Sequence, residues 1–208
     1  MTINNSIDSS QSPPTSRFRW RVVDIVVAAV LGVACGLIYF GWSAVYGPLN
    51  ALLKVAIPGL DGLLGGMWLL GGVLGGLIIR RPGAALFVEL VAALVPALIG
   101  NQWGTTTLVS GILQGLGAEI VFAIFLYKRW KLPVAVLAGV LAAAFEWCFE
   151  IIVWYPENTL QFKGLYLLFL AISGAVLAGV LGWLLAQALA RTGALDRFES
   201  GREVRKLV

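Results

Sequence analysis

Long apolar runs occur six times along this chain, and they constrain its fold more than any other feature. Each has roughly 18 residues or more, the length that an α-helix needs to cross the hydrocarbon core of a membrane. The runs cover residues 22–46, 62–80, 82–100, 104–127, 132–155 and 164–190. A bilayer offers no water to backbone polar groups, so segments that cross it are helices or closed barrels. The sequence therefore predicts an all-α integral membrane protein with six transmembrane helices.

The composition supports this class and excludes several others. Hydrophobic residues make up 59% of the chain and charged residues only 12%, which is too little polar surface to cover a soluble domain. The net charge of +4 comes from basic residues that flank the apolar runs, so nucleic acid is not an expected partner. The chain has no histidine, which removes Ser-His and Cys-His catalytic pairs and histidine metal sites. We expect no enzyme, no catalytic residue, no metal site and no cofactor.

Basic residues also predict how the helices are oriented. Of the fifteen lysines and arginines, all but Lys54 and Lys163 precede the first run, follow the last one, or lie in the second and fourth links. Because basic residues are retained in the cytoplasm, both termini are expected there. Residues 1–16 are then a disordered cytoplasmic N-terminus, 17–191 the membrane domain and 192–208 a basic cytoplasmic tail.

The first outer link, residues 47–61, is longer than the basic links and partly apolar. Two interpretations fit it. It could re-enter the membrane as a flap over an outward-facing cavity, where protein or water would satisfy its backbone. Alternatively, its NALLKVAI stretch (50–57) forms a short helix at the membrane interface. The two interpretations are compatible with each other.

Two glutamates lie in the outer half of the fifth run, Glu146 and Glu150. Ionisable groups at membrane depth are costly, so they are rarely without function. The two side chains are four residues apart and share one helix face with Trp154. The runs contain no basic residue that could pair with them. We therefore expect an outward-facing cavity for an organic cation or amide, with Glu150 as the first choice for the ligand carboxylate.

Two further glutamates, Glu89 and Glu119, lie in the cytoplasmic half of their runs. Counting residues at about 1.5 Å each places the two at similar depth. They could share a proton, cap a cytoplasmic link near Arg80 or Arg81, or line the floor of the cavity. A structural role is favoured for Glu119, and the role of Glu89 stays open.

Amides and indoles complete the candidate site. Asn101 ends the third run, and Gln114 lies on one stripe of the fourth with Ser110. Trp68 and Trp147 lie deeper than the other indoles, and ligand contact and ordinary packing are both open for them. Indoles and phenols at interface depth, including Trp103 and Tyr155, are interpreted as membrane anchors.

A stripe of small residues marks the first helix, with Ala28, Gly32 and Gly36 at four-residue spacing. Small residues let another helix approach closely in lipid, where the hydrophobic effect does not drive helices together. For this stripe a partner-docking face is favoured over packing within the chain. Similar stripes in the second and sixth helices are interpreted as internal packing.

Three segments resemble the YkoE family, the substrate-binding S components of energy-coupling factor (ECF) vitamin transporters. They are IIRRPGAALFVELVAAL (78–94), LIGNQWG (98–104) and GILQGLGAEIVF (111–122). The resemblance implies an S-component bundle of six helices that binds thiamine or its hydroxymethylpyrimidine precursor from outside. It also implies a transmembrane T component and ATPase subunits as partners. Ala28, Gly32 and Gly36 match the family's docking pattern in character, and its polar positions are matched by Glu89, Asn101, Gln114 and Glu119.

The residues and the resemblance predict the same function. The chain is expected to capture thiamine or hydroxymethylpyrimidine in the bacterial cell membrane, for an importer whose ATP is used by partner subunits. It carries no Walker motif of its own. The predicted binding residues are Trp68, Glu89, Asn101, Gln114, Glu119, Glu146, Trp147 and Glu150. The alternative is a stand-alone, proton-coupled carrier for an organic cation or another vitamin, with Glu89 or Glu119 as the proton site. A purely structural subunit would leave the outer acids without a purpose.

Overall fold

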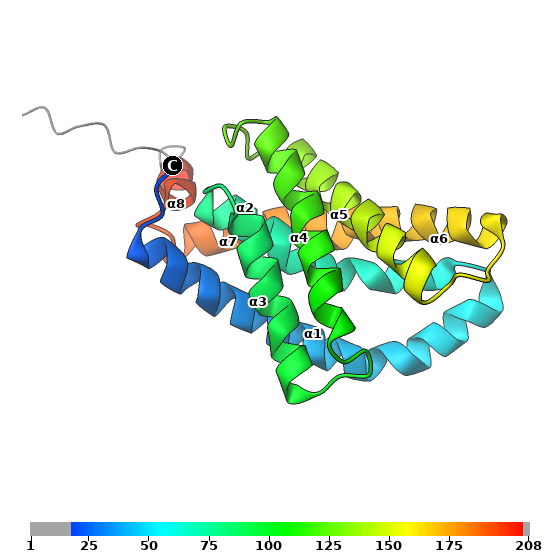
Figure 1. Cartoon of the computed structure of the whole chain (residues 1–208). Coiled ribbons are helices and arrows are strands. Elements are labelled where there is room, and N and C mark those ends of the chain that lie inside the picture. Colours follow the sequence, from blue (N-terminus) through cyan, green and yellow to red (C-terminus); the bar gives the residue numbers. More distant parts are fainter. Residues whose placement is uncertain (1–17, 206–208) are drawn as a thin grey trace, which may run out of the picture.

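Every regular element of the computed structural model is a helix within the described residues, which are 18–205 with side chains up to Arg202 (Figure 1). The α-helices are α1 (Val22–Ala56), α2 (Leu70–Ile79), α3 (Ala84–Ile99), α4 (Thr106–Ile124), α5 (Leu132–Val153), α6 (Leu160–Ser173), α7 (Gly182–Arg191) and α8 (Glu199–Arg205). A 3-10 helix, η1 (Leu60–Leu69), leads into α2, and a π-helix, η2 (Gly174–Leu181), joins α6 to α7. The predicted disordered segment, 1–16, lies outside the described part.

Five helical stretches are long and apolar enough to cross a membrane. They are Val22–Ala56, Leu60–Ile79, Thr106–Ile124, Leu132–Val153 and Leu160–Arg191. The remaining predicted run folds as α3, which is apolar but only 16 residues long. It lies among three other helices, α1, α2 and α4. The predicted all-helical membrane fold is therefore confirmed, and among the six predicted runs only the one that folds as α3 gives a helix shorter than a usual span.

Helix α1 is longer than predicted, because it absorbs most of the first outer link. It continues through Pro48 to Ala56. The re-entrant flap is therefore wrong, and the NALLKVAI stretch is the last part of α1 rather than a separate helix. A proline inside a helix removes one backbone hydrogen bond and bends the axis. Figure 1 shows the cyan end of α1 turning away from the direction of its blue start.

The small-residue stripe of α1 is used inside the chain. Ala28, Gly32 and Gly36 are all buried, and a methyl group on Gly32 would lie 2.6 Å from the Cβ of Val91 in α3. On Gly36 it would lie 2.7 Å from the backbone oxygen of Ala92. The stripe lets α1 and α3 pack closely. In this structure the three residues are used for packing within the chain. Their role as a partner-docking face stays a prediction.

The second predicted helix begins as a 3-10 helix, and its glycines explain why. Gly59, Gly62 and Gly65 are three residues apart, which places them on one face of a helix with three residues per turn. A methyl group on Gly59 or Gly62 would come within 2.7 Å of the backbone of Tyr166. One on Gly65 would overlap the side chain of Leu170. This glycine face lets η1 lie against α6 at backbone distance.

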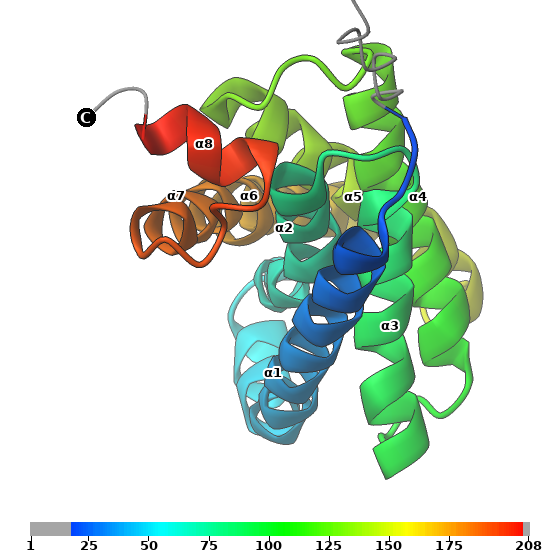
Figure 2. The ribbon, with the colours of Figure 1, turned by 90° about the vertical axis from the view of Figure 1, so that its left-hand side faces the viewer.

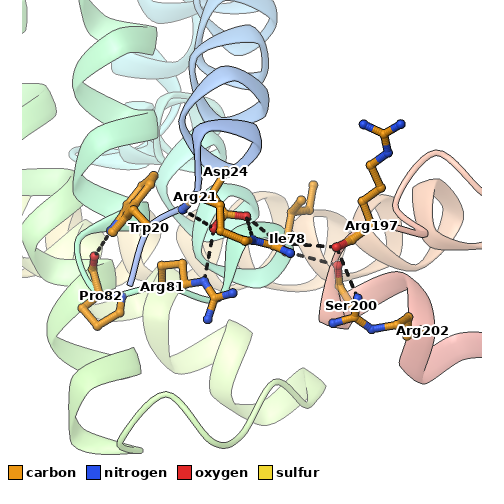
Figure 3. Close-up of polar contacts among 9 residues, drawn as sticks. All are labelled: Trp20, Arg21, Asp24, Ile78, Arg81, Pro82, Arg197, Ser200 and Arg202. Carbon is orange, nitrogen blue, oxygen red and sulfur yellow. Dashed lines mark hydrogen bonds and ion pairs between the residues drawn. The ribbon is translucent and has the colours of Figure 1, made fainter. Parts of the chain in front are cut away.

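A polar cluster joins the start of α1 to the link between α2 and α3, at the end of the molecule where most basic residues lie. Asp24 of α1 is fully buried. One of its oxygens accepts from the guanidinium of Arg21 at 2.7 Å, and the other from Nε of Arg81 at 3.3 Å (Figure 3). The hydrogen bond to Asp24 raises the pKa of Arg21, which favours the charged pair. Trp20 adds a bond from its indole N–H to the carbonyl of Pro82 at 2.9 Å.

Part of the predicted tail, 192–208, folds back onto this cluster. Figure 2 shows α8 lying beside α2 and α7, and Leu195 and Phe198 before it are buried. The hydroxyl of Ser200 donates to the carbonyl of Ile78, at the end of α2, at 3.1 Å. The tail is therefore a structural part of the bundle up to α8, and residues 206–208 lie outside the described part.

Candidate functional site

A cavity between the helices gathers most of the polar side chains of the apolar runs. It encloses about 630 Å³ of space not filled by atoms, its open mouth included. Its lining residues are Tyr39, Tyr46, Gly65, Trp68, Glu89, Ala93, Trp103, Thr106, Thr107, Ser110, Gln114, Glu146, Phe149, Glu150, Trp154 and Tyr166. Five of the predicted binding residues are among them, namely Trp68, Glu89, Gln114, Glu146 and Glu150.

Glu89 of α3 lies at the cavity wall, and all of its donors reach a single oxygen. The Tyr39 hydroxyl of α1 donates to Oε2 at 3.1 Å, and the backbone N–H of Gly72 donates to the same atom at 2.5 Å. The Tyr39 hydroxyl accepts from the N–H of Gly71 at 2.6 Å. Oε1 of Glu89 is buried without a hydrogen-bond partner. A buried acceptor without a donor is unfavourable, so a ligand donor at Oε1 would be stabilised.

Glu146 of α5 repeats this arrangement on another wall. The hydroxyl of Ser110 donates to its Oε1 at 2.7 Å, and the side-chain amide of Gln114 donates to Ser110 at 2.8 Å. Ser110 and Gln114 are one turn apart on α4 and so share a face. Oε2 of Glu146 is buried and has no partner. The cavity thus presents a second carboxylate oxygen that lacks a donor.

Glu150 lies one turn after Glu146, and its partner comes from α6. The hydroxyl of Tyr166 donates to Oε2 of Glu150 at 2.7 Å. Every donor that reaches these three carboxyl groups is a hydroxyl or a backbone N–H. None of the lining residues is a lysine or arginine. The cavity is therefore acidic and suits a ligand that carries a positive charge or several N–H donors.

An aromatic cluster forms the remaining wall. The rings of Tyr46, Trp68 and Trp103 lie 5.1–5.3 Å apart by their centroids and meet edge to face. They come from α1, η1 and the link before α4. Aromatic faces attract cations and pack well against flat rings. The cavity therefore combines a surface for a planar group with carboxylates that can bind its polar edges.

One further acidic residue, Asp61, lies next to the cavity and interacts with residues outside the lining. Asp61 of η1 is buried, and it accepts from the Tyr155 hydroxyl at 3.2 Å and pairs with Lys54 at 3.8 Å. The Tyr155 ring lies 5.2 Å from that of Tyr166. Burial raises the pKa of Tyr155, so its phenol keeps the proton that it donates. Lys54 thus forms its ion pair with Asp61 rather than with a carboxylate of the cavity lining.

Glu119 of α4 lies outside the cavity, and its side chain contacts the backbone at the start of α3. One of its oxygens accepts from the N–H of Gly83 at 2.6 Å, and the other from Ala85 at 2.9 Å. The hydroxyl of Tyr127 donates to it at 2.6 Å, and burial raises the pKa of that tyrosine. A carboxylate there satisfies N–H groups that the first turn leaves unpaired. This geometry agrees with the structural role that the sequence favours.

Asn101 and Trp147 are also absent from the cavity lining, but both form hydrogen bonds that fix the segments around it. The amide of Asn101 donates to Thr107 at 3.0 Å, and its oxygen accepts from the N–H of Trp103 at 2.7 Å. Both partners line the cavity. The indole of Trp147 donates to the carbonyl of Lys163 at 2.8 Å, which ties α5 to α6. In this structure these two residues position the walls, and ligand contact by either of them stays a prediction.

Several lining residues were not singled out by the sequence analysis, including Tyr39, Tyr46, Phe149 and Tyr166. For Tyr39 a signal existed, because a phenol in the middle of an apolar run needs a buried partner for its hydroxyl. Trp103 was interpreted as a membrane anchor, although it joins the aromatic cluster. Phe149 carries no polar group, and its position in the sequence does not distinguish it from a core residue.

Comparison with known proteins agrees with this fold. A family described as the permease component of an ABC-type cobalt transport system matches residues 23–145. A Bacillus subtilis (strain 168) protein described as an HMP/thiamine permease, YkoE, is 36% identical over 188 residues. That alignment covers 90% of this chain and 93% of the relative. HMP here stands for hydroxymethylpyrimidine.

The fold has a solved counterpart as well. The crystal structure of an S component of an ECF transporter matches with a TM-score of 0.83 and 34% identity. The match covers 90% of this chain and 94% of that one. Its fold and the identity to YkoE agree with the family predicted from the sequence. The chain therefore belongs to the YkoE family of ECF transporter S components, and it is a multi-pass transport protein of the cell membrane rather than an enzyme.

Proposed function

We propose that this protein captures thiamine, or its hydroxymethylpyrimidine precursor, from outside the cell for an ATP-driven ECF importer. The observation that carries the proposal is the cavity, in which Glu89 and Glu146 each keep a buried oxygen without a donor. The absence of lysine and arginine from the lining supports a cationic or amine-bearing ligand. The description of YkoE as an HMP/thiamine permease supports the same ligand class.

The chemistry of thiamine matches the two kinds of wall. Its exocyclic amine is a donor for the buried, unpartnered oxygens of Glu89 and Glu146, and its pyrimidine ring can donate as well when it is protonated. Its thiazolium ring carries a permanent positive charge, and contact with an indole stabilises such a charge by roughly 0.5–2 kcal/mol. Trp68 and Trp103 offer that contact. Hydroxymethylpyrimidine shares the pyrimidine but not the charged ring, so it would use the carboxylates more than the aromatic wall.

A metal ion is a poorer fit as cargo, although the matching family is described as a cobalt permease. Divalent cobalt binds several nitrogen, oxygen or sulfur ligands at once. Within the described part of the chain, no group of three or more His, Cys, Asp or Glu residues is arranged to hold a metal. The aromatic cluster also favours a flat organic ligand. The donor set thus supports an organic cation over cobalt.

The proposal includes six crossings with both termini in the cytoplasm. Helix α3 would be the sixth, with its short length offset by packing among α1, α2 and α4. The basic residues support the orientation, because all but two fall before α1, between α2 and α3, between α4 and α5, or from the last residue of α7 onward. Cysteine labelling from either side of the membrane would test it, and a label that reaches the α4–α5 link from outside would contradict it.

Transport by the isolated chain distinguishes the importer from a stand-alone carrier. The chain has no Walker motif, so uptake into vesicles should need a T component, ATPase subunits and ATP. Vesicles that hold only this protein should bind ligand without accumulating it. Accumulation driven by a pH gradient alone would instead favour the proton-coupled carrier.

Ligand identity is tested by thermal unfolding of the purified protein with thiamine, its phosphates and free hydroxymethylpyrimidine. A ligand that binds only the folded state raises the unfolding temperature. We expect stabilisation by thiamine or hydroxymethylpyrimidine, and its loss in Glu150→Gln. Phosphorylated thiamine should bind more weakly, since its negative charge meets an acidic cavity. No stabilisation by either ligand would reject the proposed function.

A further inference from the structure

The 3-10 helix η1 carries part of the cavity wall, contributing Gly65 and Trp68. Runs of 3-10 helix longer than three or four residues are uncommon, because their hydrogen bonds have poor geometry. With ten residues, η1 depends on outside contacts to keep its conformation. The contacts that hold η1 therefore also determine where Trp68 lies in the cavity.

One buried hydroxyl makes two such contacts. Ser173 donates its hydroxyl hydrogen to the carbonyl of Leu63, and the same oxygen accepts from the N–H of Gly66 at 3.1 Å. A 3-10 helix pairs a carbonyl with the N–H three residues later, so these are the two groups of a single η1 turn. Ser173 is only 4% exposed. Its hydroxyl thus bridges one turn of η1 from a neighbouring helix.

The position of Ser173 connects η1 to the opposite wall. Ser173 ends α6, immediately before the π-helix η2. Two turns earlier on α6 lies Tyr166, whose hydroxyl holds Glu150 at 2.7 Å. The contact between η1 and α6 therefore joins the wall with Trp68 to the wall with Glu150. The Ser173 hydroxyl makes directional hydrogen bonds in the contact between η1 and α6. Glycines and apolar side chains make the rest of that contact.

We propose that Ser173 is a positioning residue for the ligand cavity, acting through the turn of η1 that precedes Trp68. It is not among the lining residues, so it acts without touching the ligand. Loss of the hydroxyl leaves the carbonyl of Leu63 and the N–H of Gly66 without this partner and lets Trp68 shift against the Glu150 wall. This inference rests on the proposed function, because it concerns the same ligand.

The test compares Ser173→Ala with a matched serine variant in the full-length, purified protein. Ser43→Ala is the control, because the Ser43 hydroxyl donates to the carbonyl of Tyr39 within its own helix, at 2.8 Å. Thiamine affinity is measured by calorimetry at a temperature where all variants are folded. We expect Ser173→Ala to bind severalfold more weakly, with a loss no larger than that of Trp68→Leu, and Ser43→Ala to bind like the wild type. Ser173→Cys, which keeps the size and a weaker donor, should fall between wild type and Ser173→Ala.

A double-mutant cycle separates positioning from general stability. If Ser173 acts through Trp68, then adding Ser173→Ala to Trp68→Leu should weaken thiamine binding little further, because the positioned residue is already gone. A residue that only stabilises the fold would lower the unfolding temperature of the free protein and leave affinity unchanged.

The outcomes distinguish the two proposals. Wild-type affinity in Ser173→Ala, or losses that add fully in the double variant, would overturn the role of Ser173 alone. Failure of the wild-type protein to bind thiamine and hydroxymethylpyrimidine would overturn the proposed function and the role of Ser173 with it.

Discussion

Carboxylates at the two ends of the molecule have opposite surroundings. At the basic end, Asp24 is paired with two arginines, and Glu119 accepts from the backbone of α3 and from a tyrosine. At the cavity, Glu89 and Glu146 receive neutral donors on one oxygen and keep the other without a partner. The difference teaches that depth in an apolar run does not identify a ligand group. What marks the candidate site is a shared cavity, which Glu89, Glu146 and Glu150 line without any lysine or arginine.

Asp24→Ala should give the largest effect, and it should be an effect on stability. The change leaves the nearly buried Arg81 without this partner, and removing one member of a buried ion pair costs about 3–5 kcal/mol. We expect a matching loss in the free energy of unfolding, measured by denaturation in detergent. Any folded fraction should bind thiamine normally. Unchanged stability, or a selective loss of affinity, would contradict the structural role of this end.

Glu146→Gln should have the opposite pattern of effects, with weaker thiamine binding and no loss of stability. Loss of the charge removes a ligand partner, and truncating one member of such a pair costs about 2–5 kcal/mol, or roughly 30-fold or more in affinity. The free protein should be equally stable or more stable, because an uncompensated buried charge is relieved. Calorimetric titration and thermal unfolding of the same sample measure both quantities. A destabilised protein with unchanged affinity would make Glu146 structural, like Asp24.

Glu119→Gln sharpens the comparison, since it is the same substitution at the other end. The carboxylate accepts from the N–H groups of Gly83 and Ala85 with two oxygens, whereas an amide has only one acceptor oxygen. One N–H group would then lose its partner, and an unpaired buried donor costs about 1–3 kcal/mol. We expect lower stability with unchanged thiamine affinity. If affinity falls as it does in Glu146→Gln, then Glu119 belongs functionally to the ligand site.

Trp68→Leu should give the smallest effect, and one that depends on the ligand. It removes a cation–π partner, so thiamine affinity should fall by about 0.5–2 kcal/mol. Hydroxymethylpyrimidine lacks the permanent charge and should be affected less. Trp147→Leu is the matched control, because that indole lies outside the cavity and bonds to the carbonyl of Lys163. Equal losses for both ligands would argue against a thiazolium contact at the aromatic wall.

The sequence predicted the fold class and much of the cavity, for identifiable reasons. Apolar runs of membrane length, with basic links between them, predict helices directly. Trp68, Gln114, Glu146 and Glu150 were found because polar or large aromatic groups are unusual in such runs. These residues line the cavity in the structure.

The sequence could not predict features that depend on which helix lies next to which. A stripe such as Gly32 and Gly36 allows close approach to any helix, and the structure shows that the neighbour is α3. Glu89 was assigned to the depth of Glu119, although it lines the cavity with Glu146. Depth along α3 does not show which of its faces meets the cavity, because that depends on the helices packed around it.

The central claim is tested most directly by titrating thiamine into the purified wild-type protein and into Glu150→Gln side by side. Calorimetry gives the stoichiometry and the dissociation constant of each. The cavity predicts one thiamine per wild-type chain and a markedly weaker or undetectable titration for Glu150→Gln, with both proteins equally folded. Equal binding by the two proteins, or no binding of either thiamine or hydroxymethylpyrimidine by the wild type, would contradict the role given to the acidic cavity.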